Sequence, residues 1–256
     1  MAQDRVWLDV PFGEKDEAKA AGARWDPGAK RWYAPRPGIA GLARWSARED
    51  VPELLPGEDR HFGSGLFVDL VPSSCWFTNV RYCVSVQDWE RLRRMLLRRA
   101  RYQCEACERG EDRDAKRWLE AHERWSFDAS TLTQKLVRLI CLCTDCHQTT
   151  HYGLAQVRGR DAAAFAHLRA VTGMSEQAAQ DHVRDAFEVW QRRSQASWSL
   201  DLTMLTDAGI TLAKPPHAHE RGEIAEHELR VAHQREIEDR QPVAVAPRRS
   251  RWWPRG

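Results

Sequence analysis

The sequence predicts an α+β protein with two folded units and a tail, and three observations support this prediction. Residues 1–48 alternate strand-like and helix-like patterns within a short span. The middle of the chain contains two C-x-x-C pairs, which are typical of a small metal-stabilised domain. Helical patterns follow these pairs, and after them comes a charged segment with few large apolar side chains.

Residues 1–48 are expected to form a small βαββ unit. The segment from Val6 to Val10 has the pattern of a strand, and residues 14–21 have the Ala, Lys and Glu content of a helix that stops at Gly22. An Asp-Pro-Gly turn at residues 26–28 then separates two short aromatic strands, ARW and KRWYAP.

This unit resembles a short domain family of unknown function that carries the segments LDVPF, EKDEAKA, GARWD and KRWY. That family recurs beside plasmid primase-like and other DNA-processing modules, and the resemblance covers about residues 6–36. Trp25 and Trp32 have two interpretations. They are core residues of a mini-domain, or they form, with Lys30 and Arg31, a surface that stacks on nucleic acid.

Residues 49–80 are punctuated by Pro and Gly, which predicts an irregular connecting segment. Residues 81–212 are expected to form the second unit, which opens with an amphipathic helix over residues 88–103. Residues 81–160 contain 16 Lys and Arg against 11 Asp and Glu, although the whole chain has a net charge of only +2. The arginines of the helix are either a solvated face or a phosphate-binding surface. They are Arg91, Arg94, Arg98, Arg99 and Arg101.

Two further helices are expected over residues 161–173 and 175–194, where they would buttress the second unit. His167 and His182 lie in these helices. Neither has a Cys or His partner at ligand spacing, so both are expected to be surface or core residues without a role in a metal site.

Four cysteines have the spacing of a structural zinc site. Cys104 and Cys107 form one pair, Cys143 and Cys146 form the other, and 35 residues separate the pairs. Two such pairs satisfy tetrahedral zinc and leave no open position for catalysis. The alternative, four reduced buried cysteines, does not explain the repeated spacing. Cys141 lies in a buried-strand pattern and is expected to be a packed thiol rather than a fifth ligand.

Three histidines are candidates for a second metal site. His147 and His151 are four residues apart, so they share one face if a helix begins near Cys146. Two histidines alone make an incomplete site, and His122 is the expected third ligand. Three imidazoles would leave coordination positions open for water and a phosphate oxygen.

The segments RRARYQCEAC, LEAHERW and LVRLICLCTDCHQTTH resemble a zinc-finger-bearing HNH endonuclease domain of the ββα-metal class, over about residues 88–153. The resemblance implies that the four cysteines hold structural Zn²⁺. It implies that His122, His147 and His151 hold a catalytic divalent cation such as Mg²⁺, Mn²⁺ or Zn²⁺. It also implies that DNA is the partner, with RNA as the alternative.

Two positions depart from the family pattern. Glu123 stands where the family has its general-base histidine, and Arg138 stands where it has an orienting asparagine. Glu123 would activate water as a weaker base, or bind the ion if the strand bends to bring it to the same face as His122. Arg138 would clamp a phosphate or pair with Glu123.

The leading hypothesis is therefore a metal-dependent HNH endonuclease that hydrolyses phosphodiester bonds. The alternative is a catalytically impaired zinc module that binds nucleic acid or a protein partner, which the two departures favour. A third hypothesis assigns all seven candidate ligands to two structural zinc ions.

The remaining expectations concern the tail and the compartment. Residues 213–256 are expected to form a flexible tail with a charged helix around residues 219–240. No apolar run reaches the roughly 18 residues of a membrane span, and the first residues do not resemble a signal peptide. The chain is therefore expected to be cytoplasmic. No heptad pattern is present, and the sequence does not predict an oligomeric state.

Overall fold

A computed structural model describes residues 5–75 and 79–213. The described residues all lie in the first of the two units into which the chain divides, residues 1–215 and 216–256. The second unit, with the charged helix expected around residues 219–240, lies outside the described residues. Within the described ranges, none of the helices combines the length and the apolar character that a membrane span requires.

The N-terminal elements follow the predicted βαββ order: β1 (Val6–Leu8), α1 (Lys15–Ala20), β2 (Arg24–Asp26) and β3 (Arg31–Ala34). The strands form an antiparallel sheet in the order β1-β3-β2. Short 3₁₀ turns lie at Phe12–Glu14 and Ala40–Trp45. A separate apolar core joins the sheet, α1 and the second of these turns. Its buried residues are Leu8, Val10, Ala18, Ala23, Ala34, Leu42 and Trp45.

The two candidate tryptophans of this unit have different surroundings. Trp32 packs against the core from a partly buried position, whereas Trp25 is 49% exposed. Their rings meet edge to face at 5.5 Å. The tryptophan that fills the core is Trp45, whose indole nitrogen donates to Glu14. The core interpretation therefore holds for Trp32 and fails for Trp25.

Residues 49–75 contain one short 3₁₀ turn, at Ser73–Cys75, and are otherwise irregular, but they also contribute to the core. Leu55, Leu66 and Val68 are buried in the core of the central region. Asp59 donates its backbone N–H to the carbonyl of Val137, and the carboxylate of Glu58 accepts from the N–H of Leu139. The segment thus covers the free edge of a strand whose backbone groups would otherwise lack partners.

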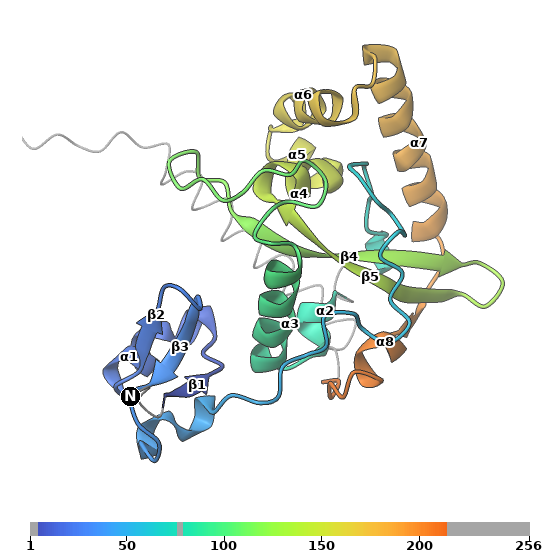
Figure 1. Cartoon of the computed structure of the whole chain (residues 1–256). Coiled ribbons are helices and arrows are strands. Elements are labelled where there is room, and N and C mark those ends of the chain that lie inside the picture. Colours follow the sequence, from blue (N-terminus) through green and yellow to red (C-terminus); the bar gives the residue numbers. More distant parts are fainter. Residues whose placement is uncertain (1–4, 76–78, 214–256) are drawn as a thin grey trace, which may run out of the picture. The chain divides into compact units, whose positions relative to one another are not determined.

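The central region is built on a long antiparallel hairpin of β4 (Leu119–Asp128) and β5 (Thr133–Cys143), with a register shift between Arg124 and Trp125. The short strand β6 (Ser199–Asp201) pairs in parallel with the start of β5. Figure 1 shows α3 (Val86–Arg99) on one side of the hairpin and α4 (Thr144–Thr150) with α5 (Tyr152–Val157) on the other.

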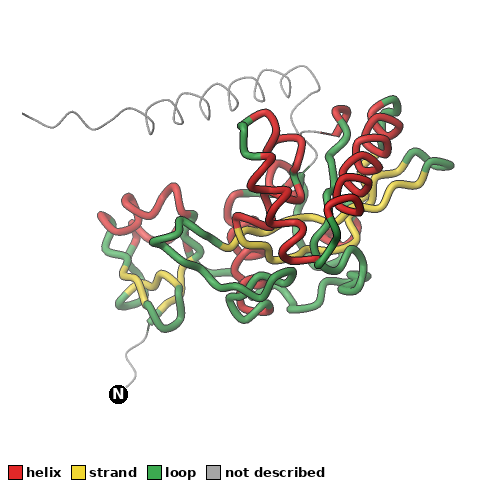
Figure 2. Tube along the Cα trace, turned by 90° about the horizontal axis from the view of Figure 1, so that it is seen from above, coloured by secondary structure: helices red, strands yellow, loops and turns green. Residues whose placement is uncertain are grey.

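The remaining helices are α2 (Val80–Cys83), α6 (Asp161–Thr172), α7 (Glu176–Ser194) and α8 (Thr203–Thr206). The helices predicted over residues 161–173 and 175–194 are observed. Gly173 adopts the left-handed conformation that ends α6, and the Ser175 hydroxyl caps α7 by accepting from the N–H of Ala178. Helix α6 packs on α4 and also contacts α7, the long helix of Figure 2.

Candidate metal centre

Helix α4 supplies ligands to two separate clusters. β5 ends at Cys143, which occupies the N-cap position of α4, and Cys146 lies in the first turn of the helix. His147 lies in the middle of the helix, and His151 follows one turn later at its C-cap. The two clusters therefore share one rigid element, because a helix turn fixes the spacing between its side chains.

The four predicted zinc cysteines come together. The sulphur atoms of Cys104, Cys107, Cys143 and Cys146 all lie within 4.8 Å of one another. All are buried except Cys107, which is partly exposed. This set of four sulphurs fits a tetrahedral metal ion such as Zn²⁺. Cys141 is not part of the cluster, and burial raises the pKa of its thiol to about 12, as suits a packed, inert residue.

Hydrogen bonds within the cluster shift the pKa values of its thiols in opposite directions. Bonds from Cys143 and Cys146 hold the pKa of Cys104 well below its ordinary value. The bond to Cys104 raises the pKa of Cys143 to about 12. Metal binding would displace the protons of these thiols, because the thiolate is the form that binds a metal ion.

The three predicted histidine ligands also come together. The ligand nitrogens of His122, His147 and His151 lie within 4.8 Å of one another, and the ring centroids are 4.7 to 5.2 Å apart. Burial lowers the pKa of His151 to about 3 and that of His122 well below its usual value. Neutral imidazoles keep a lone pair for a metal ion at pH 7.

Glu120 is a residue of this cluster that the sequence reasoning missed. Its carboxylate lies 3.1 Å from Nδ1 of His147. Burial alone would raise the pKa of Glu120, but the hydrogen bond with His147 lowers it below its usual value. The missed signal was the two-residue spacing from His122, since such residues share one face of a strand.

Arg124 lies two residues beyond His122 on the same face, and it too was missed. Its side chain is fully buried, with one terminal nitrogen 3.4 Å from Nε2 of His122. The guanidinium stacks on the ring of Phe67 and lies 4.0 Å from the carboxylate of Asp69. A positive charge here opposes a nearby metal ion and favours an anion.

Glu123 is not among the residues whose ligand atoms converge with the three histidines. Neighbouring residues of a regular strand point to opposite faces, and the register shift in β4 begins only after Arg124. The carboxylate of Glu123 instead accepts from the backbone N–H of Val80 at 2.9 Å. Burial raises the pKa of this carboxyl group. The bend that would let Glu123 bind the same ion as His122 is absent from the described strand.

Arg138 does not pair with Glu123. One terminal nitrogen lies 3.1 Å from a carboxylate oxygen of Glu105, and the other donates to the carbonyl of Phe62 and the hydroxyl of Ser64. The residue is 5% exposed. Arg138 therefore ties the irregular segment and the first cysteine loop to the hairpin.

Comparisons with known proteins match parts of the chain. The family model named Domain of unknown function (DUF5710) matches residues 5–46. These residues form a DUF5710 domain. A DNA primase TraC of Escherichia coli is 58% identical over 56 residues, which cover 22% of this chain and 5% of the primase. A second DNA primase TraC of Escherichia coli is 42% identical over 62 residues, which cover 22% of this chain and 4% of that primase.

The chain thus matches only about a twentieth of the length of these curated relatives. No solved structure matches the chain.

Several residues predicted to bind nucleic acid form ion pairs or ring contacts within the chain itself. Asp9 of the DUF5710 domain pairs with Arg31 at 3.0 Å and with Arg94 of α3 at 2.5 Å. Lys30 lies over the ring of Tyr102. The other pairs are Arg91 with Asp88, Arg98 with Asp50, and Arg99 with Glu58. Of the seven predicted residues, Lys30, Arg98 and Arg101 are exposed.

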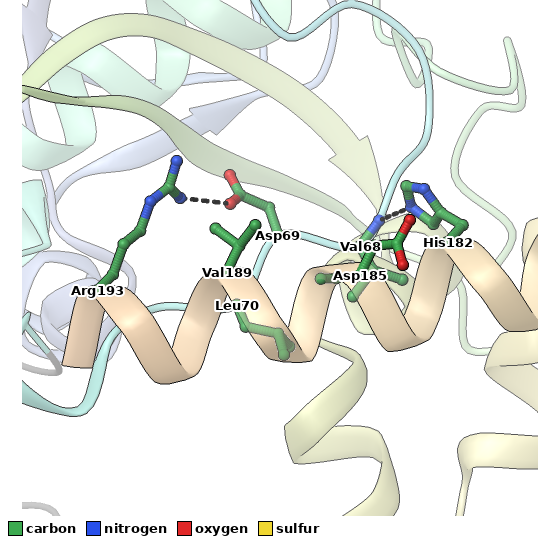
Figure 3. Close-up of a pocket in the computed structure, with 8 residues that line it drawn as sticks. Val68, Asp69, Leu70, His182, Asp185, Val189 and Arg193 are labelled. Atoms are coloured by element: carbon green, nitrogen blue, oxygen red, sulfur yellow. Dashed lines mark hydrogen bonds and ion pairs between the residues drawn. The ribbon is translucent and has the colours of Figure 1, made fainter. Parts of the chain in front are cut away.

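A cavity of about 250 Å³ lies between residues 68–70 and α7 (Figure 3). Asp69 faces Arg193 there, and Nε2 of His182 accepts the backbone N–H of Val68 at 3.0 Å. His182 is therefore a structural residue, as predicted. None of the candidate ligands lines this cavity, so it is separate from both clusters.

Proposed function

We propose that the central region is a metal-dependent endonuclease of the HNH type that hydrolyses phosphodiester bonds in DNA. The observation that carries this proposal is the convergence of His122, His147 and His151 beside the four-cysteine cluster. Four sulphurs close a metal site, whereas three nitrogens leave positions open for a substrate. One cluster therefore suits a structural role and the other suits chemistry.

The three imidazoles fit a divalent transition metal, and the guanidinium of Arg124 beside His122 would favour an anion such as a phosphate on that ion. Imidazole is a common ligand for such ions, and Glu120 orients His147 as carboxylates do in many metal sites. A cation bound there would polarise a phosphate oxygen and stabilise the leaving oxygen. The His147 side chain is 28% exposed, which gives the cluster an opening to solvent.

The positions of Glu123 and Arg138 imply a slow enzyme. One carboxylate oxygen of Glu123 accepts the N–H of Val80, and we infer that this bond holds the carboxylate away from a water at the histidines. Loss of a positioned general base costs on the order of 10² to 10⁴ in rate. DNA as the substrate class rests on the two primases with which the chain shares a segment and on the exposed Arg98 and Arg101.

The second candidate function is a zinc module that binds nucleic acid without cutting it. The structural engagement of Glu123 and Arg138 favours it, because both departures from the family then serve the fold.

Plasmid nicking separates these functions. The purified full chain is incubated with supercoiled plasmid and Mg²⁺, Mn²⁺ or Zn²⁺, beside His151→Ala and the matched control His182→Ala. We expect nicking by the parent and the control and its loss in His151→Ala. If no metal supports nicking, the nuclease is excluded. If the parent and His151→Ala also bind DNA with equal affinity in a gel shift, the binding module is supported.

Metal content provides an independent test. We expect one Zn²⁺ that resists chelation, held by the four cysteines, and one exchangeable ion. Substitution of His151 by Ala should remove only the exchangeable ion. Two ions that both resist chelation would support the third hypothesis, in which both sites are structural.

A further inference from the structure

The imidazole of His167 contacts the four-cysteine cluster from α6. Its Nε2 atom lies 3.2 Å from Sγ of Cys146. This distance is within hydrogen-bonding range for sulphur. Because 21 residues separate His167 from Cys146, ligand-spacing patterns do not reveal the contact. The sequence predicted no role for His167 in a metal site, but the fold brings its imidazole to one.

We propose that His167 is a positioning residue of the metal-loaded four-cysteine site. Its Nε2–H donates a hydrogen bond to the thiolate of Cys146, and this bond makes metal retention depend on the placement of α6. The inference concerns the four cysteines only and is independent of nuclease activity at the histidine cluster.

The chemistry of the loaded site supports a donor at this position. Four thiolates around a divalent ion carry a net charge of about −2, so N–H donors that point at sulphur stabilise the site. The backbone N–H groups of Ala106 and Cys143 already point at Cys104, and that of Cys146 points at Cys143. His167 provides the equivalent contact to Cys146 from a side chain.

The proton must reside on Nε2 in this arrangement. A metal-bound thiolate has no hydrogen and can only accept, so the imidazole has to be the donor. His167 is not a fifth ligand, because the four sulphurs complete the tetrahedron and its nitrogen is not among the converging ligand atoms.

The packing of α6 holds the imidazole in place. Ala164 and Leu168 are buried, and they share a helix face with His167. The hydroxyl of Thr149 in α4 bonds to the carbonyl of Ala164 at 3.3 Å. Helix α6 is thus attached to α4 about one turn before the contact with Cys146.

Zinc release measures the contact directly. The zinc-loaded full chain is mixed with excess chromophoric chelator, and the rate of zinc transfer is compared among the parent, His167→Phe, His167→Gln and the control His182→Phe. Phe keeps a ring but cannot donate, whereas Gln retains an N–H donor. We expect about 10- to 100-fold weaker retention in His167→Phe, the effect typical of lost outer-shell partners. Gln should recover part of the loss.

Two measurements distinguish this role from ligation and from misfolding. The charge-transfer bands of the Co²⁺-loaded His167→Phe variant should retain parental intensity, since four thiolates still bind the ion. In the parent loaded with metal, NMR of ¹⁵N-labelled histidine should place the His167 proton on Nε2, a result that needs no variant. Parental release from His167→Phe, altered Co²⁺ bands or an unprotonated Nε2 would each overturn the proposal.

Discussion

Nδ1 of His147 lies 3.1 Å from a carboxylate oxygen of Glu120, and this pairing selects which nitrogen of the imidazole can bind a metal ion. A neutral imidazole has one N–H, so a proton held on Nδ1 by Glu120 leaves the Nε2 lone pair available. Glu120 and His122 share one face of β4, which brings the orienting carboxylate and a candidate ligand to the same helix.

Substitution of this carboxylate should weaken the exchangeable metal site. Glu120→Gln removes the negative charge that orients His147, so we expect a 10- to 100-fold loss in affinity for Mn²⁺ or Zn²⁺ at the histidine cluster. Isothermal titration of the zinc-loaded chain measures this, with exposed Glu108→Gln as the control. Equal affinities for the two variants would show that the contact does not orient His147.

Glu123→Gln should leave plasmid nicking close to the parental rate. The amide oxygen of Gln can still accept the N–H of Val80, while the capacity to take a proton is lost. Glu123→Ala removes the acceptor and should lower the free energy of unfolding by about 1–3 kcal/mol. Initial nicking rates and urea unfolding check the two effects. A rate in Glu123→Gln that is lower by 100-fold would identify Glu123 as the proton acceptor after all.

Two arginines of the basic segment should respond differently to substitution by Ala. Arg94→Ala removes a partner from buried Asp9 and should cost about 1.5–3 kcal/mol of stability. Arg101→Ala should leave stability unchanged but weaken DNA binding and reduce the salt slope of the affinity by about 1. Urea unfolding and gel shifts at several salt concentrations measure both. The prediction fails if Arg94→Ala alters the salt slope without altering stability.

Asp88 should contribute to stability in a pH-dependent way. Burial raises its pKa, but hydrogen bonds from Ser85 and Arg91 and the charge of Arg48 lower it more, to below the ordinary 3.8. A group whose folded pKa is depressed stabilises fully above its unfolded pKa and loses this contribution as pH falls through the folded pKa. The stability difference between the parent and Asp88→Asn should therefore be constant above about pH 5 and shrink below 3.8.

Urea unfolding of both proteins at a series of pH values gives this difference. Exposed Asp114→Asn is the matched control, and it should show little difference from the parent at any pH. A difference between the parent and Asp88→Asn that grows as pH falls would contradict the expected sign.

The sequence by itself determined the local elements and the ligands within each element. The spacing of apolar residues predicted the helix now seen at Val86–Arg99, and the turn signals predicted the N-terminal βαββ order. The C-x-x-C pairs and the four-residue spacing of His147 and His151 were equally readable. These features depend on the residue periodicity of a single helix or strand, which can be recognised from residues close together in the sequence.

Only the tertiary structure decided which side chains meet across elements. It placed Glu123 on the far face from His122, joined Arg94 to Asp9, and brought His167 to Cys146. Each pairing depends on how one helix, strand or loop packs against another. The spacing of residues along the sequence does not predict that packing. A buried charge or thiolate takes the partner that the surrounding chain provides, and this partner can lie anywhere in the sequence.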